Sequence, residues 1–545
     1  MNKKIIAVAL NLHDHNTYDG VWHNQRERET RFKHNLPYRA EAYAHQSDIL
    51  NPSDYKLNDA FTKEYFKKQD DSVLAFTYTV GGIRMSKDEL LQTVLKGHDE
   101  IFEWQPKKLW DYYYKDGIYF IDHHQSHATY AFINSGFEES DCLAIDGIGN
   151  RYRCCFFDKD GNMTNLSDVL PIGWLWNHMA NLTGFGTLGA GKLMGLSAYG
   201  RMNDYFYDIF ELILSLPITE KKQEHFKYID LKKYKKEDLA HTLQQFTIDK
   251  IKEWVYPLKT SDNLCVAGGV SYNGYMNEEF TKHYKNVFVP PAVGDEGQAL
   301  GVYQHADYIL NNNKHIVETY AGKEYDWEPN EDEKASDATE FVPWSEGKGF
   351  EWGYESLFWE PLDMKLIAQE IANEKIVGWF QGKSESGNRA LGNRSILADP
   401  RNPDIKNIIN DTVKMREDFR PFAPAVLEEH YQEYFDTNQP SPYMSRIMPI
   451  KHFHLIDRIP GVIHIDETSR IQTVNREQNE KYYDLINEFY KITDIPMLLN
   501  TSFNSQEPIV EKPEHAIRTF RETAIDILVI GDWMLIKKIT GDGWG

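Results

Sequence analysis

Residues 117–149 read GIYFIDHHQSHATYAFINSGFEESDCLAIDGIG and contain two apolar runs separated by a more polar segment. The first run, Gly117–Ile121, is predicted to be a β-strand that leads through a turn into a helix over Gln125–Asn134. The second run, Cys142–Ile145, is predicted to be a strand that ends at Asp146. Alternation of apolar strands with helices is typical of layered α/β proteins, so we predict an α/β fold.

The same alternation continues on both sides of this stretch. Further strands are predicted at Ile5–Leu12, Arg153–Phe157, Leu264–Val266, Val287–Val289, Ile376–Phe380, Val426–Leu427, Met497–Leu499 and Ile527–Ile530, and further helices at Leu239–Tyr256, Asp295–Leu310 and Asp363–Asn373. Residues 322–346 carry nine acidic residues against two lysines, and we predict a solvated connector there. We therefore place a domain boundary near residue 350, which gives domains 1–350 and 351–545.

Composition narrows the class of protein. A chain of 545 residues predicts two or three domains, and a formal net charge of −23 disfavours non-specific nucleic-acid binding. Only four cysteines occur, without C-x-x-C spacing, which favours a reducing cytoplasm. The N-terminal apolar run is too short for a signal peptide, and no stretch of 18 apolar residues predicts a membrane span. We expect a cytoplasmic globular protein.

Two histidines and two aspartates form a candidate metal site. His123 and His127 are four residues apart, so both imidazoles can point the same way at the start of a helix. Asp146 follows a strand, and Asp295 lies between glycines at a predicted helix start. Two imidazoles suit Fe²⁺, Mn²⁺ or Zn²⁺ better than Mg²⁺. Capping or core histidines, and an ordinary helix cap at Asp295, are the alternatives.

Two glycine-rich segments are candidates for nucleotide binding. Residues 182–200 contain six glycines and Lys192, and glycines let a backbone approach a phosphate closely. The predicted strand Leu264–Val266 ends in Gly268 and Gly269. Each segment, taken alone, is equally compatible with a plain turn.

A basic set lies in the C-terminal half of this acidic chain. Its arginines alternate with glycine, proline and aromatic residues, which is unlike a solvated helix face, and guanidinium groups fit phosphate oxygens. Surface charge is the alternative interpretation. The candidate phosphate ligands are Arg389, Lys414, Arg416, Arg420 and Arg470, with Ser502 and Asn504 at a predicted strand end.

In combination these motifs resemble the NodU/CmcH O-carbamoyltransferases of antibiotic and nodulation-factor biosynthesis. The resemblance rests on His123-His-x-x-His-Ala, Asp146-Gly-x-Gly, Gly191-Lys-Leu-Met-Gly-Leu, Ala267-Gly-Gly-Val, Gly294-Asp-x-Gly and Gly387-Asn-Arg-Ala-Leu-Gly-Asn-Arg. It implies a duplicated actin/hexokinase-like N-terminal domain, similar to enzymes that make threonylcarbamoyl-adenosine in tRNA. It also implies a C-terminal YrdC-like α/β domain.

The resemblance further implies a division of labour. The C-terminal domain would make a carbamoyl-adenylate from carbamoyl phosphate and ATP, using the basic set. The N-terminal domain would transfer the carbamoyl group to a hydroxyl with the help of a metal, with iron favoured by the resemblance and Mn²⁺, Zn²⁺ or Mg²⁺ as alternatives. His13 is the candidate general base. The implied adenylate-binding residues are Lys192, Gly268, Gly269 and Asn273.

The sequence is also compatible with two other functions. One is a tRNA threonylcarbamoyltransferase-like enzyme, and the other is a non-enzymatic actin-like protein that senses a nucleotide. The net charge favours a small-molecule hydroxyl as acceptor, while a single-stranded nucleic acid or a modified nucleotide remains an alternative. Membrane association is not expected, and a homodimer is left open.

Overall fold

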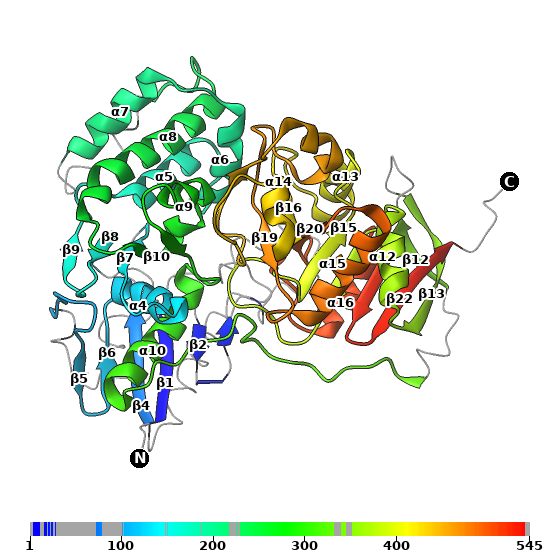
Figure 1. The fold of residues 1–545 in the computed structure, drawn as a ribbon, viewed down its shortest axis with the longest axis horizontal. Helices are drawn as coiled ribbons and strands as arrows, with labels where there is room; N and C mark the ends of the chain where they lie inside the picture. The colour runs from blue at the N-terminus through cyan, green and yellow to red at the C-terminus, as the bar shows by residue number, and fades with distance from the viewer. Residues whose placement is uncertain are drawn as a thin grey trace, which may run out of the picture. The chain divides into compact units, whose positions relative to one another are not determined.

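A computed structural model gives two compact units, Met1–Ala321 and Gly322–Gly545 (Figure 1). It describes residues 4–10, 16–18, 20–21, 23–25, 28, 72–78, 101, 103–147, 149, 151–186, 188–216, 226, 229–331, 339–344 and 351–539. In these residues no helix has both the length and the apolar character needed to cross a membrane.

The first unit contains a six-stranded sheet. Its strand order is β3 (His23–Gln25), β2 (Asn16–Tyr18), β1 (Lys4–Leu10), β4 (Ser72–Tyr78), β6 (Ile118–Phe120) and β5 (Tyr113–Lys115). Strands β1, β2 and β3 form an antiparallel meander, whereas β1, β4 and β6 run parallel. The parallel strands present buried residues on the face that packs against helices, such as Ile5, Ala7 and Ala9 of β1.

The second sheet of this unit repeats that topology. Its strand order is β11 (Asn286–Phe288), β10 (Asn263–Ala267), β7 (Asp141–Ile145), β8 (Cys154–Phe157) and β9 (Met163–Asn165). Strands β7, β8 and β9 form an antiparallel meander, and β7, β10 and β11 run parallel. The first unit is therefore built from two copies of one strand arrangement, with β5 added to the first sheet.

One helix follows the last parallel strand of each sheet. Helix α4 (His123–Ser135) follows β6, and α10 (Gln298–Asn311) follows β11 after the short helix η9 (Asp295–Gly297). The two helices pack directly on one another. A Cβ atom at Gly301 would lie 1.9 Å from the Ser126 carbonyl oxygen, so this close crossing depends on a glycine. The crossing brings the starts of α4 and α10 close to the end of β7.

A second group of helices lies between β9 and β11 in the chain. It consists of α5 (Ile172–Leu182), α6 (Ala190–Leu196), α7 (Asp204–Ser215), α8 (Lys236–Trp254) and α9 (Gly274–Phe280). Helix α8 contacts each of the other four. The predicted helix Leu239–Tyr256 corresponds to α8, and the glycine-rich segment predicted at 182–200 contains α6.

The second unit is built on a nine-stranded mixed sheet. Its order is β12 (Thr339–Trp344), β13 (Glu351–Pro361), β22 (Trp533–Ile539), β21 (Ile527–Ile530), β14 (Val377–Phe380), β15 (Arg394–Ala398), β20 (Met497–Ser502), β16 (Ala423–Leu427) and β19 (Gln472–Val474). Helices α12 (Met364–Ala372), α15 (Glu480–Thr493) and α16 (Pro513–Glu522) contribute buried residues to its core. The predicted α/β class is confirmed for this chain.

The unit boundary differs from the predicted one. The structure divides the chain after Ala321, ahead of residue 350, because β12 and β13 pair antiparallel and belong to the nine-stranded sheet of the second unit. The prediction of a solvated connector over 322–346 is wrong for residues 339–344, which form β12. The strand was not predicted because the surrounding residues are mostly acidic, although its own segment, TEFVPW, contains three apolar residues besides the proline.

Candidate functional site

The start of helix α4 is fixed by a capping box. The Asp122 carboxylate accepts a hydrogen bond from the His124 backbone N–H at 2.8 Å, and the Gln125 side-chain oxygen accepts one from the Asp122 N–H at 2.9 Å. His123 is therefore the first residue of the helix, and His127 lies about one turn later. Both imidazoles are buried and point the same way.

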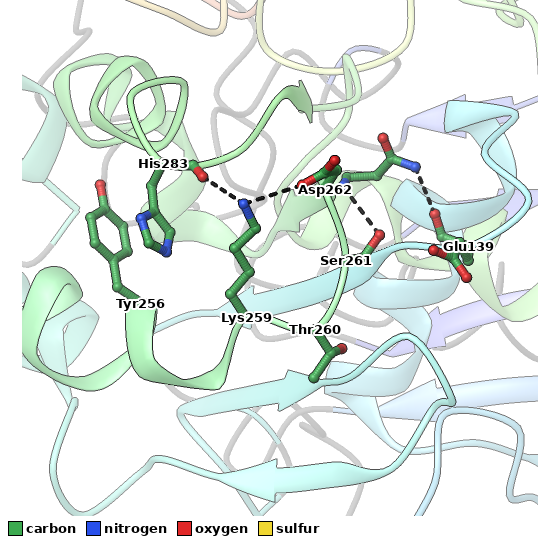
Figure 2. A pocket seen from close by; sticks show the side chains of 8 residues that line it. Glu139, Tyr256, Lys259, Thr260, Ser261, Asp262 and His283 are labelled. Carbon is green, nitrogen blue, oxygen red and sulfur yellow. Dashed lines mark hydrogen bonds and ion pairs between the residues drawn. The ribbon is translucent and has the colours of Figure 1, made fainter.

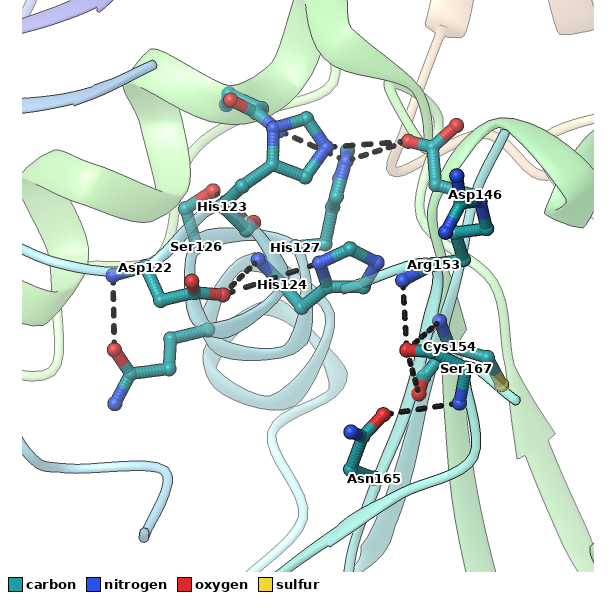
Figure 3. A network of polar contacts seen from close by, with 12 residues as sticks. Asp122, His123, His124, Ser126, His127, Asp146, Arg153, Cys154, Asn165 and Ser167 are labelled. Carbon is teal, nitrogen blue, oxygen red and sulfur yellow. Dashed lines mark hydrogen bonds and ion pairs between the residues drawn. The ribbon is translucent and has the colours of Figure 1, made fainter. Parts of the chain in front are cut away.

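The four predicted metal ligands lie together. His123 Nε2 and His127 Nε2 lie 3.3 and 3.2 Å from Asp146 Oδ2, and 3.4 and 3.5 Å from Asp295 Oδ1. One ligand atom from each residue falls within 4.8 Å of all the others. Figure 3 shows His123 and His127 of α4 turned toward Asp146 at the end of β7. Two nitrogen and two carboxylate donors fit a divalent transition metal.

The charges of this cluster balance one another. Burial alone would lower the pKa of His127, but hydrogen bonds to Asp146 and Asp295 raise it to about 9. Burial alone would raise the pKa of Asp146, but hydrogen bonds from His123 and His127 hold it well below its usual value. In the metal-free protein an imidazolium therefore neutralises part of the carboxylate charge that a metal would otherwise neutralise.

Two of the four predicted adenylate-binding residues, Gly268 and Gly269, lie against the end of β7, beside Ile145 and Asp146. A Cβ atom at Gly269 would lie 3.0 Å from Asp146 Oδ1. Gly268 has φ +95°, and a Cβ there would lie 2.2 Å from the Ile145 carbonyl oxygen. The loop after β10 therefore approaches the end of β7 as closely as it does because both positions lack a side chain.

The other two predicted adenylate-binding residues are placed differently. The Asn273 carboxamide oxygen accepts from the Met276 N–H at 3.1 Å and caps α9, while its nitrogen donates to the Gln244 side chain at 2.9 Å. Lys192 is partly buried on α6, which packs against α8. The predicted base His13 falls at 11–15, outside the described residues.

A pocket of about 500 Å³ lies near the opposite end of β7 (Figure 2). The ring of Tyr256 stacks on that of His283, with centroids 3.9 Å apart, and Lys259 donates to the His283 carbonyl oxygen at 2.8 Å. Thr260 and Ser261 donate backbone hydrogen bonds to Asp141, the first residue of β7. Since Asp146 follows the last residue of β7, this pocket is separate from the candidate metal centre.

The second unit brings four of the predicted phosphate ligands into mutual electrostatic contact. Burial, followed by the charges of three other arginines, holds the pKa of Arg470 well below its usual value, and those arginines are Arg389, Arg416 and Arg420. Burial and Arg420 lower the pKa of Arg416 to about 9. Positive charges this close together repel one another and so destabilise the folded protein when no anion is bound. The same charges favour the binding of a polyanion.

The protein holds Arg416 in place through neutral groups. Its guanidinium lies over the Phe422 ring, 4.5 Å from the centroid, and its Nε donates to the Asn410 side chain at 2.8 Å. Arg420 has a carboxylate neighbour in Glu417, at 3.7 Å.

Lys414, Ser502 and Asn504 form a second group in this unit. The Lys414 ammonium donates to the Ser502 carbonyl oxygen and to the Asn504 carbonyl and side-chain oxygens, the last two at 2.8 and 2.7 Å. The Ser502 hydroxyl donates to the Asn504 side-chain oxygen at 2.8 Å. Lys414 therefore ties the end of β20 to its own segment.

Two residues that shape these sites are not among the predicted site residues. Arg394 stacks on Phe380 at 3.6 Å and donates to the Gln381 carbonyl oxygen at 2.6 Å, so it holds the glycine-rich loop before β15. Gln298 donates to His123 Nδ1 at 2.7 Å. Its signal was present in the sequence, since Gln298 lies three residues after Asp295 at a helix start.

Comparison with known proteins now supplies the family. Residues 45–303 match the family model described as carbamoyltransferase N-terminus, and residues 368–537 match carbamoyltransferase C-terminus. Nodulation protein NolO of Bradyrhizobium diazoefficiens is 32% identical over 449 residues, which cover 77% of this chain and 79% of NolO. Nodulation protein NolNO of Sinorhizobium fredii is 33% identical over 464 residues, 77% of this chain and 64% of NolNO.

Among solved structures, the activator of the 2-hydroxyisocaproyl-CoA dehydratase from Clostridium difficile with bound ADPNP aligns with 57% of this chain and 97% of its own length. The TM-score is 0.32 and the identity 11%, values too low to establish a shared fold. The family assignment rests instead on the matched sequence. With both family models matched in order, and with relatives that are 32% and 33% identical over 77% of its length, the chain belongs to the carbamoyltransferase family.

Proposed function

We propose that this protein is an ATP-dependent O-carbamoyltransferase with two sites. The observation that carries the proposal is the meeting of His123, His127, Asp146 and Asp295 in a chain of the carbamoyltransferase family. The first unit would transfer the carbamoyl group and the second would activate it. The repeated strand order of the first unit supports an actin/hexokinase-like relationship, and a YrdC-like relationship of the second unit is part of the proposal.

In the second unit, carbamoyl phosphate and ATP would be bound by the basic residues. The positive charges around Arg470 suit the phosphate groups of both substrates. In the balanced reaction, water converts carbamoyl phosphate into carbamate and phosphate. A carbamate oxygen then bonds to the α-phosphorus of ATP, and pyrophosphate leaves. Lys414, Ser502 and Asn504 would hold the end of β20 against these substrates.

In the first unit, an acceptor hydroxyl would attack the carbamoyl carbon of the adenylate while the bond to AMP breaks. A divalent metal at the four-ligand cluster supplies Lewis-acid polarisation when bound, with Fe²⁺ favoured and Mn²⁺, Zn²⁺ or Mg²⁺ as alternatives. The loop at Gly268 and Gly269 would let the adenylate approach Asp146, and Lys192 would add a positive charge. His13 would accept the hydroxyl proton.

The acceptor is proposed to be a hydroxyl of a small molecule. The net charge of −23 supports this choice because it repels a nucleic-acid backbone at long range. A modified nucleotide or single-stranded nucleic acid would need a local basic groove and is the alternative acceptor.

The proposal is tested by giving the purified protein carbamoyl phosphate, ATP and a divalent metal, and measuring pyrophosphate. We expect pyrophosphate release that depends on carbamoyl phosphate, and acceptor products heavier by one carbamoyl group in a mass-spectrometric screen. His127→Ala should bind metal poorly and lose transfer while it retains pyrophosphate release. The absence of pyrophosphate release with every metal would contradict the proposed function. Loss of both half-reactions in a folded His127→Ala protein would contradict the division into two sites.

A further inference from the structure

The side chain of Gln298 lies against both histidines of the candidate metal centre. Gln298 is the first residue of α10 and is fully buried. Its nitrogen lies 2.7 Å from His123 Nδ1, 3.0 Å from His127 Nε2 and 3.4 Å from Asp295 Oδ1. Asp295 and Gln298 are three residues apart, so one helix start aims both a candidate ligand and this amide at the same place.

The two ring nitrogens of His123 face different partners. Nε2 faces the carboxylates of Asp146 and Asp295 at 3.3 and 3.4 Å, where a metal would bind. Nδ1 faces the Gln298 amide at 2.7 Å. A neutral imidazole carries its proton on one nitrogen only, and the hydrogen bond made by the other nitrogen decides which one. Gln298 is therefore in a position to set the tautomer of His123.

The orientation of the Gln298 carboxamide determines which ring nitrogen of His123 carries the proton. With the NH₂ group toward Nδ1, as the structure has it, Nδ1 accepts and the proton belongs on Nε2, where it can be donated to Asp146. That tautomer has no lone pair on Nε2 for a metal. A half-turn of the carboxamide puts oxygen toward Nδ1, which then donates, and the lone pair of Nε2 becomes available. Oxygen and nitrogen of the amide are nearly equal in size, so the half-turn needs little repacking.

We propose that Gln298 is a positioning residue that holds His123 in its metal-binding tautomer by presenting its carboxamide oxygen to Nδ1. This inference rests on the proposed metal site. Metal-bound histidines commonly donate their second N–H to an oxygen, and loss of that oxygen weakens metal binding by about 10- to 100-fold. The exchange moves one proton from Nε2 to Nδ1, so it leaves the net charge of the ring unchanged.

The test uses the full-length chain with Zn²⁺ and Co²⁺ as probes. Gln298→Leu removes both amide groups at similar volume, whereas Gln298→Glu keeps an oxygen that can accept from Nδ1. The matched control is Gln304→Leu, since Gln304 is also fully buried on α10 but donates to Asn134 and to the His315 carbonyl oxygen, both at 2.7 Å. Dissociation constants come from competitive dialysis, and the absorption spectrum of bound Co²⁺ reports its ligand set.

We expect Gln298→Leu to weaken Zn²⁺ binding by about 10- to 100-fold and to alter the Co²⁺ spectrum. Gln298→Glu should bind within a few-fold of wild type, and Gln304→Leu should bind as wild type does. If wild type binds neither ion, the proposed metal site itself fails. If wild type binds and a folded Gln298→Leu protein binds equally well, only the inference about Gln298 is overturned. Equal losses in Gln298→Leu and Gln304→Leu, or in Gln298→Leu and Gln298→Glu, would also overturn it.

Discussion

The two charged clusters of this molecule differ in whether opposite charges meet in them. In the first unit, opposite charges meet, and His127 lies 3.2 Å from Asp146 and 3.5 Å from Asp295. In the second unit, the charges that act most strongly on Arg470 are all positive. The first cluster can therefore exist without its ligand as a set of ion pairs. The second cluster is held by the fold against its own repulsion, and such a gathering of positive charges indicates a binding site for an anion.

The residues that hold the two clusters in place also differ. The histidine–aspartate cluster is held by its own contacts, by the helix start at Asp122 and by the hydrogen bond from Gln298 to His123. The arginines are held from outside, for example by the stacking of Arg416 on Phe422 and its bond to Asn410. Removal of one side chain should therefore weaken metal binding at the first cluster and phosphate binding at the second. It should relieve electrostatic repulsion only at the second cluster.

The largest expected effect is that of Arg470→Ala. Loss of charge-assisted bonds to phosphate, each worth about 1.5–3 kcal/mol, should reduce kcat/KM for pyrophosphate release by about 100-fold or more. Thermal stability without anions should be unchanged or higher, because the removed charge is repelled by Arg389, Arg416 and Arg420. Steady-state kinetics and thermal unfolding measure the two quantities.

A suitable control for Arg470→Ala is Arg476→Ala. Arg476 is exposed and pairs with Glu480 and Asp484, so its loss should leave pyrophosphate release unchanged. A marked destabilisation of Arg470→Ala without anions would show that the cluster is a stabilising structural network, and the contrast between the clusters would be lost.

The next effect is stabilisation of the second unit by pyrophosphate. An anion that binds only the folded protein, at about 100 times its dissociation constant, stabilises it by about 2.7 kcal/mol. We expect pyrophosphate to raise the thermal midpoint of wild type but to have little effect on Arg470→Ala. Zn²⁺ should stabilise both proteins, since its proposed ligands lie in the first unit. Equal responses of the two proteins to pyrophosphate would place the anion elsewhere.

Local patterns made most of the first site predictable from the sequence. The apolar runs located β6 and β7, and an Asp-x-x-Gln capping box sets the start of α4 at His123, two residues before the predicted start at Gln125. The order of the motifs along the chain then assigned His123, His127, Asp146 and Asp295 to one metal site. The loop of His13 lies outside the described residues, so the proposed base remains a prediction.

Pairing between distant segments was not predictable in the same way. The repeated sheet order depends on partners such as β1 and β4, which are separated by more than 60 residues. Strand β15 was missed because Arg394 and its glycine-rich neighbours resemble a binding loop, whereas the guanidinium of Arg394 is used to bond backbone carbonyls. Gln298 was missed because a neutral amide three residues after Asp295 is a weak signal by itself, and its distance to His123 shows its place.

A smaller effect concerns the pH dependence of the first cluster. The pKa of His127 is raised to about 9 by Asp146 and Asp295, so at neutral pH a metal must displace its proton. Metal affinity should therefore rise by about tenfold per pH unit up to about 9.

Without metal, the raised pKa of His127 contributes stability that is fully present below about 6.5 and is lost as pH rises through about 9. Calorimetry in buffers of different ionisation enthalpy would detect release of one proton; release of none would contradict this account.

The smallest expected effect is that of Gly269→Ala. A methyl group at residue 269 would lie 3.0 Å from Asp146 Oδ1, so the carboxylate must shift by a few tenths of an ångström. We expect a loss of about 1 kcal/mol in metal binding, or about fivefold in the dissociation constant of Zn²⁺. In Gly191→Ala the added methyl group meets open space on α6, so that variant should bind Zn²⁺ as wild type does and be more stable, by about 1 kcal/mol. Unchanged Zn²⁺ binding by Gly269→Ala would mean that Asp146 has freedom to move, and a cluster with that freedom would owe its geometry to the metal more than to the close packing of the loop after β10.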